Sequence, residues 1–254
     1  MSSSRRMDHM TWPEIEASKS KPVIVPIGST EQHSQHLPLG VDAMIASHVS
    51  EDLAERIDGI VAPTMNYGYK SKPLSGGGPL FPGTIDMNGV TVINQMHDVL
   101  GELIADGFTK IVVMNAHFEN EAFIIEAIDL ITRETKGVAT IVETNWWDPL
   151  PENVVEQVFD GLVFPGWALE HAAVTETSLM MHYEPELVHM DRVIDEAMSH
   201  RRLTCATRCA RATFRITEDW PLLQVPAPNE VSSSSMPALM RWPIFVLPNS
   251  ANDS

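Results

Sequence analysis

The sequence predicts an α/β fold, a three-layer α/β/α sandwich with a mostly parallel central sheet. Short runs rich in β-branched residues alternate along the chain with longer stretches in which apolar residues recur every three or four positions. Such alternation of strand and helix favours parallel strands that are covered on both faces. With 254 residues, 44% hydrophobic and 20% charged, the chain can bury a substantial core.

Strands and helices alternate along the chain, and each is predicted from its own residue pattern. We expect strands at residues 23–27, 60–62, 111–114 and 138–142. Gly28 ends the first strand, Gly107 is expected to end a helix, and Asn120 is expected to cap another. Three apolar stripes predict the helices: Ile45, Val49, Leu53 and Ile57; Ile93, Met96, Leu100, Leu103 and Ile104; Phe123, Ile124, Ile128 and Ile131.

Residues 63–92 are rich in proline and glycine and predict a long loop. Long ordered loops in compact domains are usually functional. Within this loop, Ser75-Gly-Gly-Gly78 could line a pocket with backbone N–H groups and the Ser75 hydroxyl, or could be an ordinary flexible turn. It is not a phosphate-binding loop, because no Gly-Lys-Ser/Thr follows it.

The amino-acid composition argues against two classes of binding partner. The net charge of −17 and the pI of about 4.8 argue against nucleic acid and against an anionic membrane, since both attract clusters of Lys and Arg. No apolar run approaches the roughly 20 residues of a membrane helix, and the N-terminus does not resemble a secretory signal. Cys205 and Cys209 do not suggest a disulfide scaffold, so we expect a cytoplasmic protein.

The character of the chain changes near residue 200. Residues 1–200 hold 11 Lys/Arg and 30 Asp/Glu, whereas residues 201–254 hold 6 and 4, together with both cysteines and six of the 18 prolines. This last part has no sustained helical or strand period. We therefore expect one domain at 1–200 and a divergent, irregular C-terminal tail at 201–254.

Two short acidic–histidine pairs carry most of the chemical information, Glu31-Gln32-His33 and His117-Phe118-Glu119. In an extended backbone, side chains two residues apart point the same way. Both pairs follow predicted strands, and open α/β sheets place ligand sites at the carboxyl ends of their strands. With Asp42 between them, the pairs could hold two divalent metals, which is the chemistry of a metal-dependent hydrolase. Taken singly, each pair is more often explained by a surface carboxylate and a satisfied loop histidine than by a functional site.

Several longer motifs occur in a consistent order between about residues 10 and 195, and together they resemble the creatininase (creatinine amidohydrolase) family, in particular its creatinine-hydrolysing members. The motifs are Ile27-Gly-Ser-Thr-Glu-Gln-His33, His36-Leu-Pro38, Val41-Asp42, Phe81-Pro-Gly-Thr-Ile85, Asn115-Ala-His-Phe-Glu-Asn120, Phe164-Pro-Gly-Trp-Ala-Leu-Glu-His171 and Thr175-Glu-Thr-Ser-Leu179.

The resemblance implies a pair of zinc or manganese ions in each subunit. One ion would be held by Glu31, Asp42 and His117, and the other by His33, Asp42 and Glu119, with Asp42 bridging. A metal-bound water would attack the ring carbonyl of creatinine, and His171 would deliver a proton to the departing ring nitrogen to give creatine. Glu119 would also help to handle the proton of the water.

The resemblance also implies a substrate pocket and an assembly. Trp147 and Trp167 match tryptophans that close over substrate, although core packing alone would also explain Trp147, and Trp146 is expected to be structural. Ser75 and Phe118 are expected to contact substrate. Family members form hexamers, so a homo-oligomer is expected.

Two other residues near these motifs have open roles. His36 is expected to support the site rather than to bind metal. Glu176 either orients a site residue or lies on a helix surface.

Two positions depart from the family pattern, and both bear on the substrate. Phe118 stands where tyrosine is common, and Ala168 stands where an aspartate usually follows the tryptophan. These departures leave open another small amide, a formamide or a peptide, as the substrate. A catalytically inactive metal-binding protein is the alternative from a different class.

Overall fold

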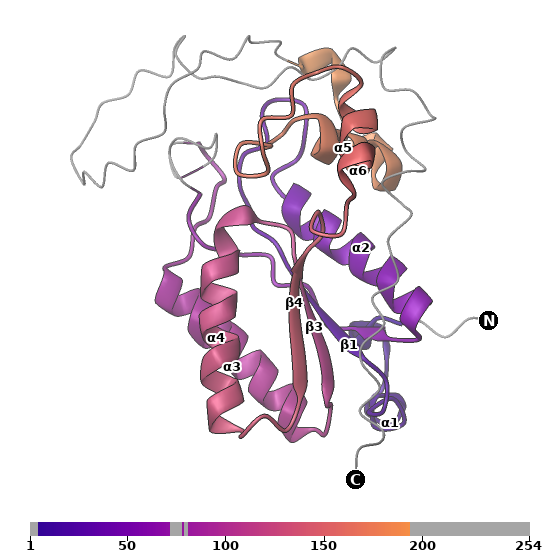
Figure 1. Ribbon diagram of the computed structural model, residues 1–254, viewed down its shortest axis with the longest axis vertical. Coiled ribbons are helices and arrows are strands. Elements are labelled where there is room, and N and C mark those ends of the chain that lie inside the picture. Colours follow the sequence, from indigo (N-terminus) through magenta and orange to yellow (C-terminus); the bar gives the residue numbers. More distant parts are fainter. Residues whose placement is uncertain (1–4, 72–77, 79–80, 194–254) are drawn as a thin grey trace.

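The computed structural model describes residues 5–71, 78 and 81–193 (Figure 1). Ser75 and the predicted tail at 201–254 therefore lie outside the described residues. The elements, in chain order, are a 3-10 helix at Met7–His9, α1 (Trp12–Glu16), β1 (Val23–Ile27), α2 (Val41–Ile57), β2 (Ile60–Val61), α3 (Gly89–Ala105), β3 (Lys110–Asn115), a 3-10 helix at Phe118–Asn120, α4 (Glu121–Glu134), β4 (Thr140–Asn145), α5 (Glu152–Phe159), α6 (Val174–Tyr183), and 3-10 helices at Pro185–Leu187 and Met190–Arg192.

The described strands form one four-stranded parallel sheet in the order β2-β1-β3-β4. The predicted α/β class and the parallel sheet are confirmed. β4 begins later and ends later than the predicted 138–142. Its end is later because the polar residues 143–145 pair with the end of β3, where Asn145 lies opposite Asn115. Pairing of the backbone extends the strand past the point at which its apolar side chains stop.

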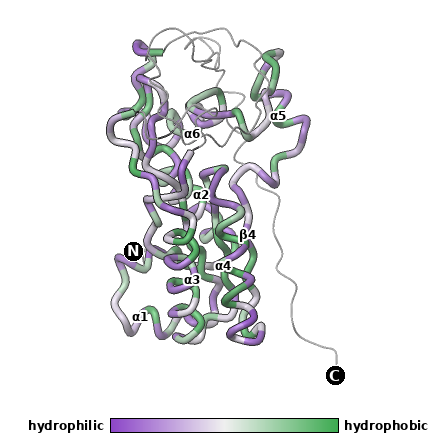
Figure 2. The backbone as a smooth tube through the Cα atoms, turned by 90° about the vertical axis from the view of Figure 1, so that its left-hand side faces the viewer, coloured by the Kyte–Doolittle hydropathy of each residue, from purple (hydrophilic) through white to green (hydrophobic). Residues whose placement is uncertain are grey.

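The two faces of the sheet are covered differently. On one face, α3 and α4 pack on alternate strand residues such as Val25 and Val113, and this cluster is largely aliphatic. On the other face, α2 packs on residues such as Ile24 and Val112, and the cluster continues into the aromatic residues Trp146 and Trp147. α5 and α6 lie beyond the end of the sheet that is opposite to α1 (Figure 2).

The sequence predicts a glycine stop at the end of α3 and an asparagine cap at the start of α4. The first prediction is confirmed and the second is wrong. Gly107 follows α3 with a φ of 101°, and the Phe108 N–H bonds to the Leu103 carbonyl, which is the expected glycine stop. Asn120 precedes α4, but its side chain makes no capping bond. The amide instead joins the Gly28 carbonyl at 3.0 Å to the Tyr69 N–H at 2.8 Å.

Among the described residues, no helix combines the length and the apolar character needed to cross a membrane.

Candidate metal centre and its pocket

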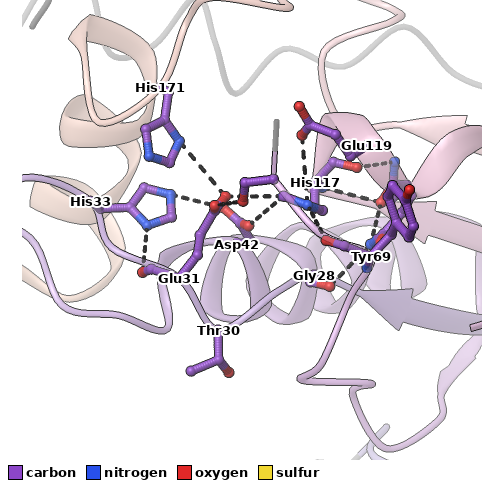
Figure 3. Close-up of polar contacts among 12 residues, drawn as sticks. Gly28, Thr30, Glu31, His33, Asp42, Tyr69, His117, Glu119 and His171 are labelled. Atoms are coloured by element: carbon purple, nitrogen blue, oxygen red, sulfur yellow. Dashed lines mark hydrogen bonds and ion pairs between the residues drawn. The ribbon is translucent and has the colours of Figure 1, made fainter. Parts of the chain in front are cut away.

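The two acidic–histidine pairs meet at the carboxyl ends of β1 and β3, as the sequence predicts. Glu31 and His33 follow β1, and His117 lies two residues past the end of β3. Asp42 lies in the first turn of α2 and points toward both (Figure 3). Gly28 makes this approach possible, because a Cβ there would lie 2.3 Å from the Ala43 nitrogen.

Glu31, Asp42 and His117 form a first group of metal-ligand type. His117 Nδ1 lies 3.0 Å from Glu31 Oε1 and 3.0 Å from Asp42 Oδ2. One ligand atom from each of the three lies within 4.8 Å of the others, and all three residues are buried. This is the set expected for one of the two ions.

A second group forms around the other oxygen of Asp42. His33 Nε2 lies 2.9 Å from Asp42 Oδ1 and 3.6 Å from Glu176 Oε2. His33, Asp42 and Glu176 are buried and also fall within 4.8 Å of one another. Asp42 thus turns one oxygen toward each histidine, which is the arrangement of a bridging carboxylate.

Backbone carbonyls fix which ring nitrogen each histidine presents. His117 Nε2 bonds to the Tyr69 carbonyl at 2.9 Å, which leaves Nδ1 to face Glu31 and Asp42. His33 Nδ1 bonds to the carbonyl of Glu31 at 3.1 Å, which leaves Nε2 to face Asp42. A second bond of this kind commonly sets the tautomer of a metal-binding histidine. Glu31 also has a supporting bond, because the Ser71 hydroxyl donates a hydrogen bond to its Oε2.

The donor set fits divalent cations. His33 Nε2 and Asp42 Oδ2 are buried and make no hydrogen bond within the described part of the chain, although opposite charges lie close by. Burial lowers the pKa of both His33 and His117, but the facing carboxylates outweigh burial and raise each pKa well above its usual value. The site therefore favours positive charge at these nitrogens, and zinc or manganese would supply it.

Glu119 and His171 lie on opposite sides of this centre (Figure 3). Glu119 Oε2 is 3.6 Å from His117 Nε2, and Glu119 belongs to none of the three such groups among the described residues, the third of which combines Glu31, His33 and His171. His171 Nδ1 is 3.7 Å from Glu31 Oε1, and its ring lies 4.4 Å from the ring of His33. Glu176 thus lies beside His33 and Asp42, where Glu119 was expected to complete the second group, and the expected role of Glu119 as a ligand stays a prediction.

A pocket opens over the metal groups and has aromatic walls. Trp147 and Trp167 are nearly parallel at a centroid distance of 5.9 Å, and Phe118 lies 6.3 Å from Trp147. Trp146, expected to be structural, also lines the pocket, edge-on to Trp147. The lining residues are Glu31, Asp42, Ser71, Ala116, His117, Phe118, Glu119, Trp146, Trp147, Trp167, Ala168, Glu170, His171 and Glu176.

Sequence reasoning missed one residue of this pocket and left another undecided. Glu176 is buried, and its Oε2 accepts a hydrogen bond from the Ala172 N–H, so it is no surface carboxylate. Glu170 is also buried and accepts a bond from the Thr175 N–H at 2.9 Å. Burial, and then the charge of Glu176, raises the pKa of Glu170 to about 8. The only signal for Glu170 in the sequence was its position next to His171.

His36 is buried and belongs to none of the groups of metal-ligand type in the described part of the chain. Its Nε2 is 3.0 Å from Thr177 Oγ1, and burial, followed by the charge of His33, lowers its pKa to about 4. A neutral, buried His36 agrees with the supporting role expected for it.

The chain matches a protein-family model and several proteins of known function. The family model described as "Creatininase: Creatinine amidohydrolase" matches residues 8–223, a stretch that extends beyond residue 200. The chain is 37% identical to the creatinine amidohydrolase of Pseudomonas putida over 243 residues, which are 92% of this chain and 88% of that protein. It is 30% identical to the mycofactocin precursor peptide peptidase of Mycolicibacterium smegmatis, over 68% of this chain and 62% of that protein.

Solved structures give the same picture. A mutant creatininase of a Zn-Zn type matches with a TM-score of 0.77 and 33% identity over 94% of this chain and 93% of that chain. A structure described as creatininase Mn matches with a TM-score of 0.74 and 34% identity, over 93% of each chain. A mutant creatininase complexed with creatine matches with a TM-score of 0.76 and 33% identity, also over 93% of each chain.

Proposed function

The chain belongs to the creatininase family, and we propose that it is a metal-dependent amidohydrolase that converts creatinine to creatine. Membership of this family supports the assignment of the chain as a hydrolase. The substrate and the use of two metal ions are the proposed part.

One observation carries the proposal: two three-residue groups share Asp42 at the floor of a pocket with aromatic walls. Five side chains from four parts of the chain converge there, and all five are buried. They are Glu31, His33, Asp42, His117 and Glu176. Two divalent cations in these groups would activate a water molecule and polarise the carbonyl of an amide.

The remaining pocket residues have roles that follow from their positions. Trp147 and Trp167 present nearly parallel rings that can hold a flat, polar ring and exclude water. Opening a cyclic amide forms a C–O bond, breaks the C–N bond and requires a proton on the departing nitrogen. His171, at the edge of the metal groups, can deliver that proton, and Glu119, on the opposite side, can take one from the attacking water.

A direct experiment is to load the purified protein with Zn²⁺ or Mn²⁺ and to measure both metal content and the conversion of creatinine to creatine. We expect about two ions per chain and creatine formation that requires them. Two bound ions without turnover of creatinine would reject the substrate, and fewer than two ions would reject the shared centre.

A second candidate is another small amide, such as a formamide or a peptide. Phe118 and Ala168 line the pocket with apolar groups, and one relative is named as a peptide peptidase. A panel of cyclic amides, formamides and short peptides would reveal this function as faster turnover than that of creatinine. No turnover of any amide with metal bound would indicate an inactive family member.

We further propose that the protein acts as a homo-oligomer, of which a hexamer is the expected size, in the cytoplasm. Light scattering of the metal-loaded protein measures the assembly directly, and a monomer would contradict it.

A further inference from the structure

Gln32 lies between two residues of the metal groups and holds the ring of His171. Its main-chain carbonyl oxygen accepts a hydrogen bond from His171 Nε2 at 2.8 Å. Its side-chain nitrogen lies 3.2 Å from the same ring nitrogen. Gln32 is buried, and the His171 side chain is 14% exposed, so water competes little for these contacts.

The side chain of Gln32 also closes a tight turn. Its Oε1 accepts the Ser34 N–H at 2.8 Å, and because a backbone N–H can only donate, this bond fixes the orientation of the amide. Ser34 has a φ of 60°, a left-handed conformation that is uncommon for serine. The Gln32 N–H is bound to Thr84 Oγ1 at 3.1 Å. The turn thus holds the Gln32 carbonyl in place.

The two contacts on His171 Nε2 make opposite demands. The carbonyl requires an N–H at this nitrogen, whereas the amide N–H requires a lone pair. The carbonyl is the closer partner, at 2.8 Å against 3.2 Å, and it therefore selects the Nε2–H form. In the neutral ring, Nδ1 then carries the lone pair and faces Glu31 Oε1 of the first metal group at 3.7 Å (Figure 3).

We propose that Gln32 is a positioning residue for His171: its side chain closes the turn to Ser34 that presses its own carbonyl against Nε2, so that the lone pair of Nδ1 faces the reacting atoms. The inference rests on the proposed function for the use of this lone pair. Nδ1 takes up the proton that the departing nitrogen needs, which comes from the attacking water by way of Glu119, and delivers it to that nitrogen. The ring then returns to its neutral Nε2–H form, and no proton is gained or lost by the enzyme.

Two variants test whether the hydrogen bond from the Ser34 N–H to the Gln32 side chain, rather than the size of that side chain, positions His171. Gln32→Glu has the same shape and keeps an oxygen for the Ser34 N–H. Gln32→Leu has a similar volume but offers no acceptor, so the Ser34 N–H loses its partner. Both are compared with the wild type after loading with Zn²⁺, which permits ¹⁵N NMR of the histidine rings.

The ¹⁵N spectrum reports the protonated nitrogen of His171 whether or not any substrate is turned over. We expect Nε2–H in the wild type and in Gln32→Glu, and a mixture of tautomers in Gln32→Leu. We also expect kcat of Gln32→Leu to fall roughly 10- to 100-fold, with KM and zinc content close to wild type.

A wild-type ring protonated at Nδ1 would overturn the inference, as would an unchanged tautomer in a folded Gln32→Leu that binds zinc normally. Should Gln32→Leu fail to fold, the wild-type spectrum still decides, because only Nε2–H agrees with the proposal. An Nε2–H ring in a protein that does not hydrolyse creatinine would reject the proposed substrate and leave the positioning role intact.

Discussion

The two groups of ligands that share Asp42 differ in where their other members come from. Glu31 and His117 both follow neighbouring strands of the sheet, β1 and β3. The second group combines His33, also after β1, with Glu176 from α6, far along the chain. Apart from the shared Asp42 of α2, the first group is therefore built by the edge of the sheet, whereas the second exists only once α6 has packed beside α2. The following experiments test this difference.

The largest effect is expected from Asp42→Asn, because this carboxylate belongs to both groups. An amide cannot supply the negative charge that two cations and their histidines share. Metal content, measured by mass spectrometry, should fall from about two ions per chain to nearly none, and activity should fall by more than about 100-fold. A variant that keeps both ions would contradict a shared carboxylate. Asp52→Asn, also on α2 but bonded to the Tyr183 hydroxyl at 2.7 Å, serves as the control.

Removing one carboxylate of the second group should cost one ion. Glu176→Gln is expected to retain a single ion, held by Glu31, Asp42 and His117, because the other group then lacks its third anion. Glu119→Gln should retain both ions while losing most of its activity. If Glu119→Gln loses one ion and Glu176→Gln loses none, Glu119 is the ligand and the grouping seen in the structure does not describe the loaded enzyme.

Acid should empty both groups together, because each contains one histidine. In the metal-free protein, burial lowers the pKa of His33 and of His117, but the facing carboxylates raise both pKa values well above the usual value. Protons then compete with metal for both rings. Affinity should fall with falling pH, by about tenfold per unit for each proton displaced. Calorimetry in buffers of different ionisation heat would measure the protons released, and affinity that does not change with pH would contradict this competition.

The smallest effect should come from Ser71→Ala, which acts on the first group alone. The Ser71 hydroxyl bonds to Glu31 and to neither His33 nor Glu176. Loss of such a supporting bond typically weakens metal binding by about 10-fold. Competition with a chelator should show one weakened ion and one unchanged ion. Equal weakening of both would mean that the two groups act as one unit.

Much of the fold could be predicted from local patterns. The apolar runs of β1 and β3 and the stripes of α2, α3 and α4 each lie within one element, so burial of that element leaves its mark in neighbouring residues. The end of β4 could not be predicted, because residues 143–145 are polar and owe their strand conformation to pairing with β3. Asn120 misled in the same way, since its side chain serves Gly28 and Tyr69, which lie far away in the sequence.

The residues of the site also differ in how far local sequence patterns could predict them. Glu31, His33 and His117 could be found because they follow strands at a spacing of two, and Asp42 because it lies in a recognisable motif. Glu176 gave only an even choice between a supporting and a surface role. The α6 sequence is polar enough for a surface helix, yet residues 174–180 are buried. The boundary proposed at residue 200 stays a prediction.

By itself, the sequence determined the kinds of ligand and the strands that carry them, because the period of a strand and the chemistry of a side chain are local properties. Only the tertiary structure brings Glu176 beside His33 and the Gln32 carbonyl beside His171 Nε2. Both depend on distances between segments that are more than 100 residues apart, and no local pattern records such distances.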